Sequence, residues 1–254
     1  MTSLQKISLA VFSVLFVFAV VFSYLINSQF IKMSEKPWHM QPFIDADLLT
    51  AEYEDKYEQF DGRPLLPKFA DSMRTTVVIL VDAWGVPFDE NWLAEDFAVF
   101  KELPHKSFLH FRLANRTRHA EFAELRHAKF GGVYLFGGDS LEYGRNLYID
   151  TLRYTQKIFC QKCSDSVMLG KLDSLLSLDS LFAPEEAKLV ALTTLDSRDG
   201  DRFKLHTTLR EIADVARKHP GVRFIIQGTH RPILGDPKIR RESFTHWVPA
   251  VVIN

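Results

Sequence analysis

Three polar residues stand next to predicted secondary-structure elements, and together their types suit group-transfer chemistry. Asp82 follows the apolar run Thr75–Val81, and His230 follows the apolar run Val222–Ile226. Thr117 precedes a predicted helix, so its hydroxyl would lie at a positive helix end. Ligands of open α/β sheets bind beyond the carboxyl ends of the strands. A carboxylate and an imidazole there could hold a zinc-like ion, which would activate the hydroxyl and stabilise a transferring phosphoryl group.

Each of these residues also has an ordinary structural explanation. An aspartate after a strand is often a turn or cap residue, and a threonine before a helix is most often its N-cap. A single histidine in a loop usually has no function of its own. Metal ligands must converge to within a few Å, since zinc–ligand bonds are about 2.0–2.3 Å long. The distances among Asp82, Thr117 and His230 therefore separate a metal site from an unrelated α/β domain.

The elements that must position these residues alternate between strands and helices from Arg74 onward. The first strand is apolar throughout, which is typical of a parallel sheet buried on both faces. This alternation predicts an α/β domain with a mostly parallel sheet and helices on both faces. Further strands are predicted at Phe108–Leu113, Gly132–Phe136, Lys188–Thr194 and Trp247–Ile253, and helices at His119–Lys129 and Thr207–Lys218.

Composition narrows the class of protein. The 254 residues are 46% hydrophobic and 25% charged, which is typical of a globular chain. The net charge of −1 argues against a nucleic-acid binder, because such proteins normally carry a basic excess. Two cysteines are too few for a disulfide-dense scaffold or a four-cysteine zinc site.

The N-terminal segment has the composition of a membrane anchor. Ile7–Ile26 is a run of twenty uncharged residues, and a helix needs roughly 20 apolar residues to cross a bilayer. The run is longer than the apolar region of a signal peptide and ends without small residues. We therefore expect an uncleaved transmembrane helix within residues 1–27, a juxtamembrane connector at 28–72 and the α/β domain at 73–254.

The order of motifs in the body resembles the alkaline phosphatase/sulfatase superfamily, and within it the membrane-anchored phosphoethanolamine-transferase-like branch. The first strand is followed by Asp82, and the corresponding strand in that branch ends at an acidic metal ligand. The segments that carry the resemblance are VVILVDAWGVP (Val77–Pro87), NRTRHAEFAELR (Asn115–Arg126), GGVYLFGGDSLEYGRNLYID (Gly131–Asp150), LVALTTLDSRDGD (Leu189–Asp201), IIQGTHRP (Ile225–Pro232) and THWVPAVVIN (Thr245–Asn254).

The resemblance implies a function and a location. Thr117 would be the nucleophile, and Asp82, Thr117 and His230 would hold one divalent ion, expected to be zinc. The protein would transfer or hydrolyse phosphate-linked or sulfate groups on an envelope lipid or glycan. The body would lie on the periplasmic or extracellular side of the membrane, and a membrane protein could be its partner.

The sequence departs from the family pattern at three positions. Thr229 replaces the carboxylate of the family's G-D-H motif, which should weaken metal binding. Arg198 stands where the family has the histidine of L-T-x-N-S-H, and Gly137-Gly138 stands where it has H-G. Two interpretations follow: an altered but active site, or a catalytically degenerate domain that serves as a binding or scaffold module.

An active site would need replacements for the missing groups. Asp196, Asp199 or Asp236 could supply the lost oxygen donor. Arginine suits phosphate or sulfate, because its planar guanidinium forms paired hydrogen bonds with oxyanions. The candidate anion ligands are Arg198, Arg116, Arg118 and Arg231, with Arg145 in the loop where the family has an aromatic-Arg pair.

Cys160 and Cys163 form a C-Q-K-C pair. Such a pair could be a redox site, two free thiols or a local disulfide, and no second pair exists to complete a zinc knuckle. In the oxidising compartment that the resemblance implies, a structural disulfide is the simplest interpretation.

Overall fold

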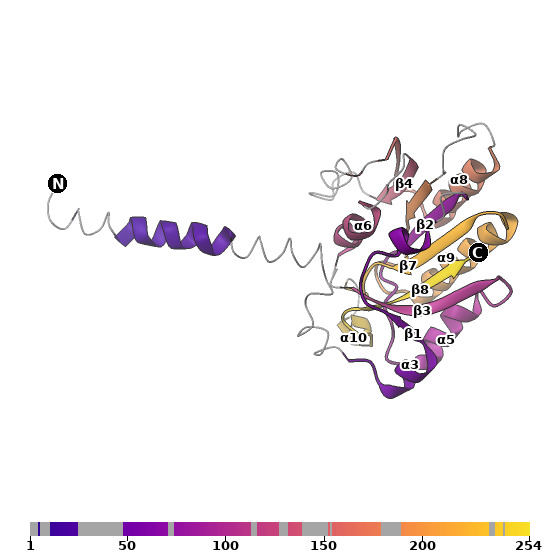
Figure 1. The fold of residues 1–254 in the computed structure, drawn as a ribbon, viewed down its shortest axis with the longest axis horizontal. Coiled ribbons are helices and arrows are strands. Elements are labelled where there is room, and N and C mark those ends of the chain that lie inside the picture. The colour runs from indigo at the N-terminus through magenta and orange to yellow at the C-terminus, as the bar shows by residue number, and fades with distance from the viewer. Residues whose placement is uncertain are drawn as a thin grey trace.

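The computed structural model describes residue 5 and residues 11–24, 48–70, 74–112, 116–126, 132–138, 152, 154–178, 189–233, 237–240 and 242–254. Its central feature is an eight-stranded sheet in the order β1-β3-β8-β7-β2-β6-β4-β5 (Figure 1). β8 runs antiparallel to both of its neighbours, whereas the other pairs of adjacent strands are parallel. The predicted mostly parallel sheet is confirmed.

The strands that the apolar runs predicted are all present, with ends shifted by up to three residues where the structure describes them. The strands are β1 (Glu58–Phe60), β2 (Thr76–Val81), β3 (His105–Phe111), β4 (Gly132–Gly138), β5 (Gln156–Gln161), β6 (Leu189–Thr193), β7 (Arg223–Gly228) and β8 (Trp247–Ile253). The helices of the domain are α3 (Ala51–Lys56), α4 (Leu65–Phe69), α5 (Glu90–Ala98), α6 (Thr117–Leu125), α8 (Asp165–Ser177), α9 (Arg202–Lys218) and α10 (Pro237–Arg240).

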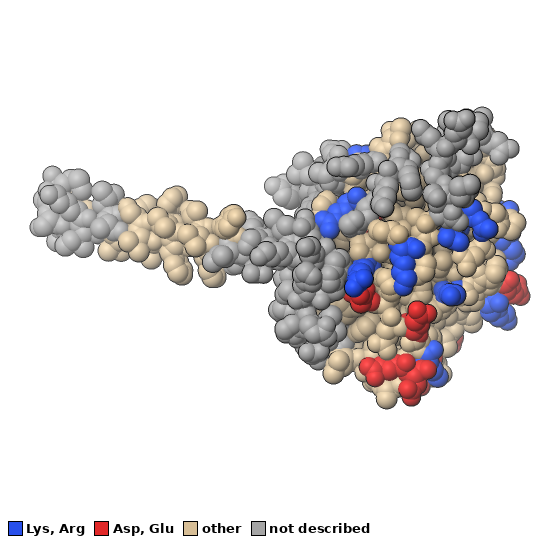
Figure 2. All heavy atoms as spheres, viewed as in Figure 1, with Lys and Arg blue, Asp and Glu red and all other residues tan. Residues whose placement is uncertain are grey.

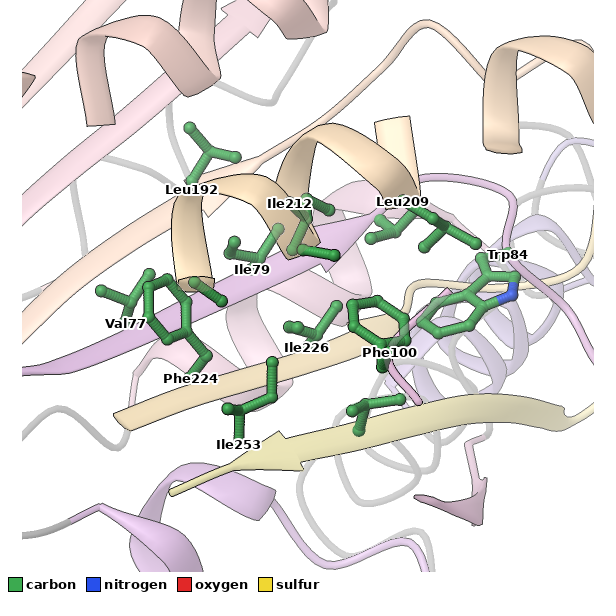
Figure 3. Packing of buried hydrophobic residues seen from close by; sticks show 14 of the residues in the cluster. Val77, Ile79, Trp84, Phe100, Leu192, Leu209, Ile212, Phe224, Ile226 and Ile253 are labelled. Carbon is green, nitrogen blue, oxygen red and sulfur yellow. The ribbon is translucent and has the colours of Figure 1, made fainter. Parts of the chain in front are cut away.

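Helices cover both faces of the sheet, as predicted, because successive strand side chains point to opposite faces. Val77 and Ile79 of β2 pack with α5, α8 and α9 in one hydrophobic cluster. Val78 and Leu80 pack with α4 and α6 in a second cluster. Figure 3 shows the first cluster, in which Leu209 and Ile212 of α9 lie over the side chains of β2, β7 and β8.

Residues 48–70 are packed into the sheet domain, although the sequence suggested that they belong to a connector. β1 pairs with β3 at the edge of the sheet, and Tyr53 and Leu65 are buried. The Tyr53 hydroxyl also donates to the carbonyl of Pro87. The sequence suggests a connector here because the segment is acidic and holds two prolines, and its apolar residues show no clear period.

The apolar N-terminal run is helical over residues 11–24. Within the described ranges, no helix combines the length and apolarity that crossing a bilayer requires.

Lys and Arg side chains are spread among acidic ones over the face drawn in Figure 2, and several acidic side chains gather near α3. Glu52 and Glu54 lie in the first turn of that helix.

Candidate active site

Asp82, Thr117 and His230 meet at the carboxyl ends of β2 and β7. The Thr117 hydroxyl donates to Asp82 Oδ1 at 2.7 Å, and His230 Nε2 lies 3.3 Å from the same oxygen. Thr117 Oγ1 and His230 Nε2 are 3.4 Å apart. Thr229 joins them, because its hydroxyl donates to Asp82 Oδ1 at 2.8 Å. The three residues therefore share one cluster, which excludes the interpretation in which they lie far apart.

Asp82 and His230 form a buried ion pair. Burial alone would raise the pKa of the Asp82 carboxyl, but the hydrogen bond and charge of His230, with the two threonine hydroxyls, hold it below its usual value. Burial alone would lower the pKa of His230, but the hydrogen bond and charge of Asp82 outweigh burial and raise the pKa of His230 above its usual value. His230 Nδ1 lies 2.6 Å from the carbonyl of Arg231, so both ring nitrogens face acceptors. This arrangement suits an imidazolium.

Glycines let the two strand-end loops approach each other closely. A Cβ atom added to Gly228 would lie 1.8 Å from the carbonyl oxygen of Trp84, and one added to Gly85 would lie 2.7 Å from Cα of Arg231. Ala83 between these contacts has a positive φ of 54°, and its N–H donates to Thr229 Oγ1 at 3.2 Å. The close approach of the loops brings Asp82 next to Thr229 and His230.

Replacing Gly228 with alanine is expected to destabilise the protein by about 3 kcal/mol or more, because backbone must move to admit the methyl group. Gly170 provides a matched control: it lies in α8 with no atom within 4 Å of an added Cβ. Gly170→Ala should stabilise by about 0.5–1 kcal/mol through helix propensity. Urea unfolding followed by circular dichroism measures both changes, and equal effects of the two variants would contradict the packing described here.

The start of α6 positions the Thr117 hydroxyl toward Asp82. Thr117 is the first residue of the helix. The residue before it, Arg116, is in the N-cap position, and its side chain makes no capping hydrogen bond. The N-cap explanation of Thr117 is therefore wrong. Burial and the charges of Arg118, Arg116 and His230 together lower the pKa of His119 to about 4. These charges make the start of α6 a positive environment that suits an anion.

A loop after β6 supports the cluster from a third strand. Ser197 Oγ donates to the carbonyl of Asp82 at 2.6 Å, and Asp82 N donates to Thr194 Oγ1. The loop is fixed by the buried carboxylate of Asp165, which accepts from the N–H groups of Leu195 at 2.7 Å and Asp196 at 3.1 Å. Burial raises the pKa of Asp165 to about 6, although these hydrogen bonds oppose the shift.

Because the folded-state pKa of Asp165 is raised, the stability that this group contributes is greatest below about pH 4 and is lost as the pH rises through about 6. The free energy of unfolding of the native chain, measured relative to Asp165→Asn, should therefore fall by about 2–3 kcal/mol between pH 4 and pH 7. Urea unfolding of both proteins across this range measures the difference. A difference that does not change with pH would mean that Asp165 titrates normally.

The arginines expected to bind an anion are placed differently from one another. Arg116 and Arg231 are next in sequence to Thr117 and His230, so their backbones border the cluster. The side chain of Arg198 is exposed and lines a separate cavity. Arg145 lies outside the described residues.

The acidic residues considered as replacement ligands are engaged elsewhere. Asp196 Oδ2 accepts from the N–H of Asp165, and Asp199 pairs with Lys204 at 2.7 Å. Asp236 lies outside the described residues. In the part of the chain that the structure describes, no three His, Cys, Asp or Glu side chains are grouped to hold a metal.

The cluster nevertheless offers three donors of different kinds to a cation. Asp82 Oδ2 receives no hydrogen bond from the described residues, so the second oxygen of this buried carboxylate is available. His230 Nε2 becomes a donor when it loses its proton, and Thr117 supplies a hydroxyl. Three protein donors with one open position is a set that catalytic zinc sites use. The set fits a divalent ion, with one charge fewer than a carboxylate at position 229 would give.

Several buried polar residues behind the cluster were not found from the sequence. The guanidinium of Arg112 donates to Gln227 Oε1 at 2.7 Å and to the carbonyl of Ala120 at 3.0 Å, which ties β3 to β7 and α6. Glu121 and Glu124 of α6 are also buried. Glu121 accepts from the Tyr134 hydroxyl and Glu124 from the N–H of Leu66. The sequence of this short helix has no pattern that indicates the burial of its two glutamates.

The structure joins Cys160 and Cys163 in a disulfide. The bond closes the turn between β5 and α8, so the local-disulfide interpretation agrees with the fold.

Comparison with known protein families finds no family that matches the sequence, and no curated protein matches it. Solved structures do match. An alkaline phosphatase superfamily protein from Vibrio parahaemolyticus is 11% identical with a TM-score of 0.52, over 73% of this chain and 61% of that one. The periplasmic domain of EcEptC from Escherichia coli is 9% identical with a TM-score of 0.49, over 73% of each chain. The lipoteichoic acid synthase LtaP from Listeria monocytogenes is 6% identical with a TM-score of 0.47, over 71% and 65%.

The chain therefore has the fold of the alkaline phosphatase superfamily, as the order of its motifs predicted. It spans about three-fifths of the length of the Vibrio parahaemolyticus protein.

Proposed function

We propose that the protein transfers or hydrolyses phosphate-linked or sulfate groups, with Thr117 as the nucleophile. The observation that carries this proposal is the convergence of Thr117, Asp82 and His230 within 3.4 Å of one another at the carboxyl edge of the sheet. The fold of the alkaline phosphatase superfamily supports it.

The chemistry follows from the hydrogen bonds of Thr117. Its hydroxyl proton points to Asp82 Oδ1, so an oxygen lone pair is free to attack a phosphorus or sulfur atom. As the new bond forms, the bond to the leaving group breaks and Asp82 accepts the hydroxyl proton. The leaving group departs as an alkoxide and takes a proton from water. Arg116 and Arg231, which border the cluster, would bind the non-reacting oxyanion atoms. Water or an acceptor alcohol then releases the group from Thr117.

Asp82, Thr117 and His230 are the residues that would hold a divalent ion, and zinc suits their mixed oxygen and nitrogen donors. When bound, such an ion would lower the pKa of the Thr117 hydroxyl and stabilise charge on the transferring group. The neutral Thr229 makes this binding weaker than a second carboxylate would.

We further propose that residues 1–27 anchor the protein in a membrane, with the body on the periplasmic or extracellular side. The uncharged run Ile7–Ile26 supports the anchor, and the Cys160–Cys163 disulfide supports an oxidising compartment. The substrate would then be an envelope lipid or glycan, and a membrane protein is a candidate partner.

A second candidate function is a non-catalytic binding or scaffold module. The observation that favours it is the hydrogen bond from Thr229 to Asp82, which fills part of the cluster with a neutral side chain. Asp82 is then neutralised by the imidazolium of His230, and no metal ion is required.

Turnover and metal content of the purified full chain distinguish the two functions. An enzyme should hydrolyse bis-para-nitrophenyl phosphate or para-nitrophenyl sulfate, and its activity should fall when a chelator removes bound metal. A folded protein with neither turnover nor bound metal would favour the scaffold.

A further inference from the structure

A second cationic site lies beside the disulfide, separate from the Thr117 cluster. It is a cavity of about 410 Å³ between the turn after β5 and the loop after β6. We call it the Lys162 cavity, and the residues that define its chemistry are Lys162, Cys163, Asp196, Arg198, Asp199 and Lys204.

The charges of the Lys162 cavity are not balanced. Asp199 is neutralised by Lys204 at 2.7 Å, and Asp196 accepts from the backbone of Asp165. Lys162 and Arg198 are both exposed and make no side-chain hydrogen bond or ion pair with any part of the chain that the structure describes. Among the described residues, two cations without a paired carboxylate therefore line the cavity against one carboxylate, Asp196, which leaves an excess of positive charge.

Lys162 is held in place by the disulfide. It lies inside the four-residue turn that the Cys160–Cys163 bond closes, and its φ of 53° is in the left-handed region. A lysine adopts this conformation rarely, so the crosslink helps to keep the backbone of Lys162 in this turn.

The loop that carries Arg198 is held by a separate set of hydrogen bonds. Asp165, in the first turn of α8, fixes the loop after β6 through the N–H groups of Leu195 and Asp196. Asp196 accepts in return from the N–H of Asp165 at 2.8 Å. These reciprocal bonds set the backbone of the Arg198 loop against the start of α8, next to the turn that carries Lys162.

We propose that the Lys162 cavity binds a phosphate oxyanion of the substrate other than the group that reacts at Thr117. A preorganised lysine and arginine suit phosphate oxygens, and the arginine can bind two of them at once. The Ser197 hydroxyl bonds to the carbonyl of Asp82, so the loop that carries Arg198 also contacts the Thr117 cluster. The inference deepens the proposed function by requiring a substrate with more than one phosphate. The source of the second phosphate is either a free polyphosphate chain or a phosphodiester head group.

The inference is tested by calorimetric binding to the full chain in detergent, in a Thr117→Ala background so that no turnover occurs. Pyrophosphate represents the free chain, and glycerophosphoglycerol represents a phosphodiester head group. Arg198→Ala and Lys162→Ala should each weaken binding of at least one probe by about five- to tenfold. Lys101→Ala and Arg210→Ala are matched controls, because both cations are exposed and line a different cavity, between α5 and α9.

Reduction of the disulfide gives a second readout. It should weaken binding about as much as Lys162→Ala does and add little in that variant, because both changes act through one residue. Loss of affinity in the Arg198 and Lys162 variants alone supports the site, and the probe that responds identifies the phosphate source. If neither probe binds, or if the control variants lose as much affinity, the inference is wrong. Because binding is measured without turnover, this result is independent of whether Thr117 is a nucleophile.

Discussion

Replacing Thr117 with alanine is expected to lower kcat/KM for phosphodiester or sulfate-ester hydrolysis by about a thousandfold or more. The substitution removes the only hydroxyl that bonds to Asp82 from α6. The fold should survive, since Thr117 is half-buried and its one strong hydrogen bond contributes about 1 kcal/mol. Steady-state hydrolysis of the two nitrophenyl esters by the full chain measures the change.

Two further variants serve as controls for this result. Thr117→Ser keeps a hydroxyl at the same position and should retain turnover within about tenfold of the native chain. Thr207→Ala removes a threonine hydroxyl of α9 that bonds to the carbonyl of Phe203, away from the site, and should leave the rate unchanged. Native rates in Thr117→Ala would show that another group is the nucleophile or that the measured activity has a different origin.

Replacing Thr229 with aspartate is expected to make stability depend on zinc. Without metal, a second buried carboxylate beside Asp82 should destabilise the protein by about 2 kcal/mol, because like charges repel and the hydrogen bond to Asp82 is lost. With metal, the added charge and oxygen should tighten binding. A zinc concentration of about 100 times the dissociation constant should then restore about 2.7 kcal/mol.

Thermal unfolding in a chelator and in zinc chloride measures both effects. Thr229→Asn is the matched control, because asparagine has nearly the volume of aspartate without its charge. It should show the smaller loss of stability and no added zinc dependence. If zinc raises the melting temperature of Thr229→Asp no more than that of the native chain, then position 229 does not face a cation site.

The strands were largely predictable because their burial on both faces leaves a clear pattern. Thr76–Val81 and Trp247–Ile253 are buried at every position, and such runs are recognisable without knowledge of their partners. β5 (Gln156–Gln161) was missed because it is an edge strand with one buried residue, Cys160.

The unpredicted helices had signals that are too weak to use alone. α5 and α8 are preceded by the N-cap residues Asp89 and Ser164, whose side chains accept from backbone N–H groups of the first turn. Such caps are common in turns as well, and each helix buries only a few residues on one side. Packing against the sheet therefore decides that these segments are helical.

The sequence by itself determined which groups could react: a carboxylate and an imidazole after buried strands, and a hydroxyl at the start of a helix. The tertiary structure decided which of them meet. β2 and β7 are neighbours in parallel register, with Val81 opposite Gly228, so Asp82 lies beside Thr229 and His230. The order of strands in a sheet depends on contacts between distant segments, which residue patterns along the chain do not contain. For the same reason, only the fold shows that Arg198 shares its cavity with Lys162 and lies outside the Thr117 cluster.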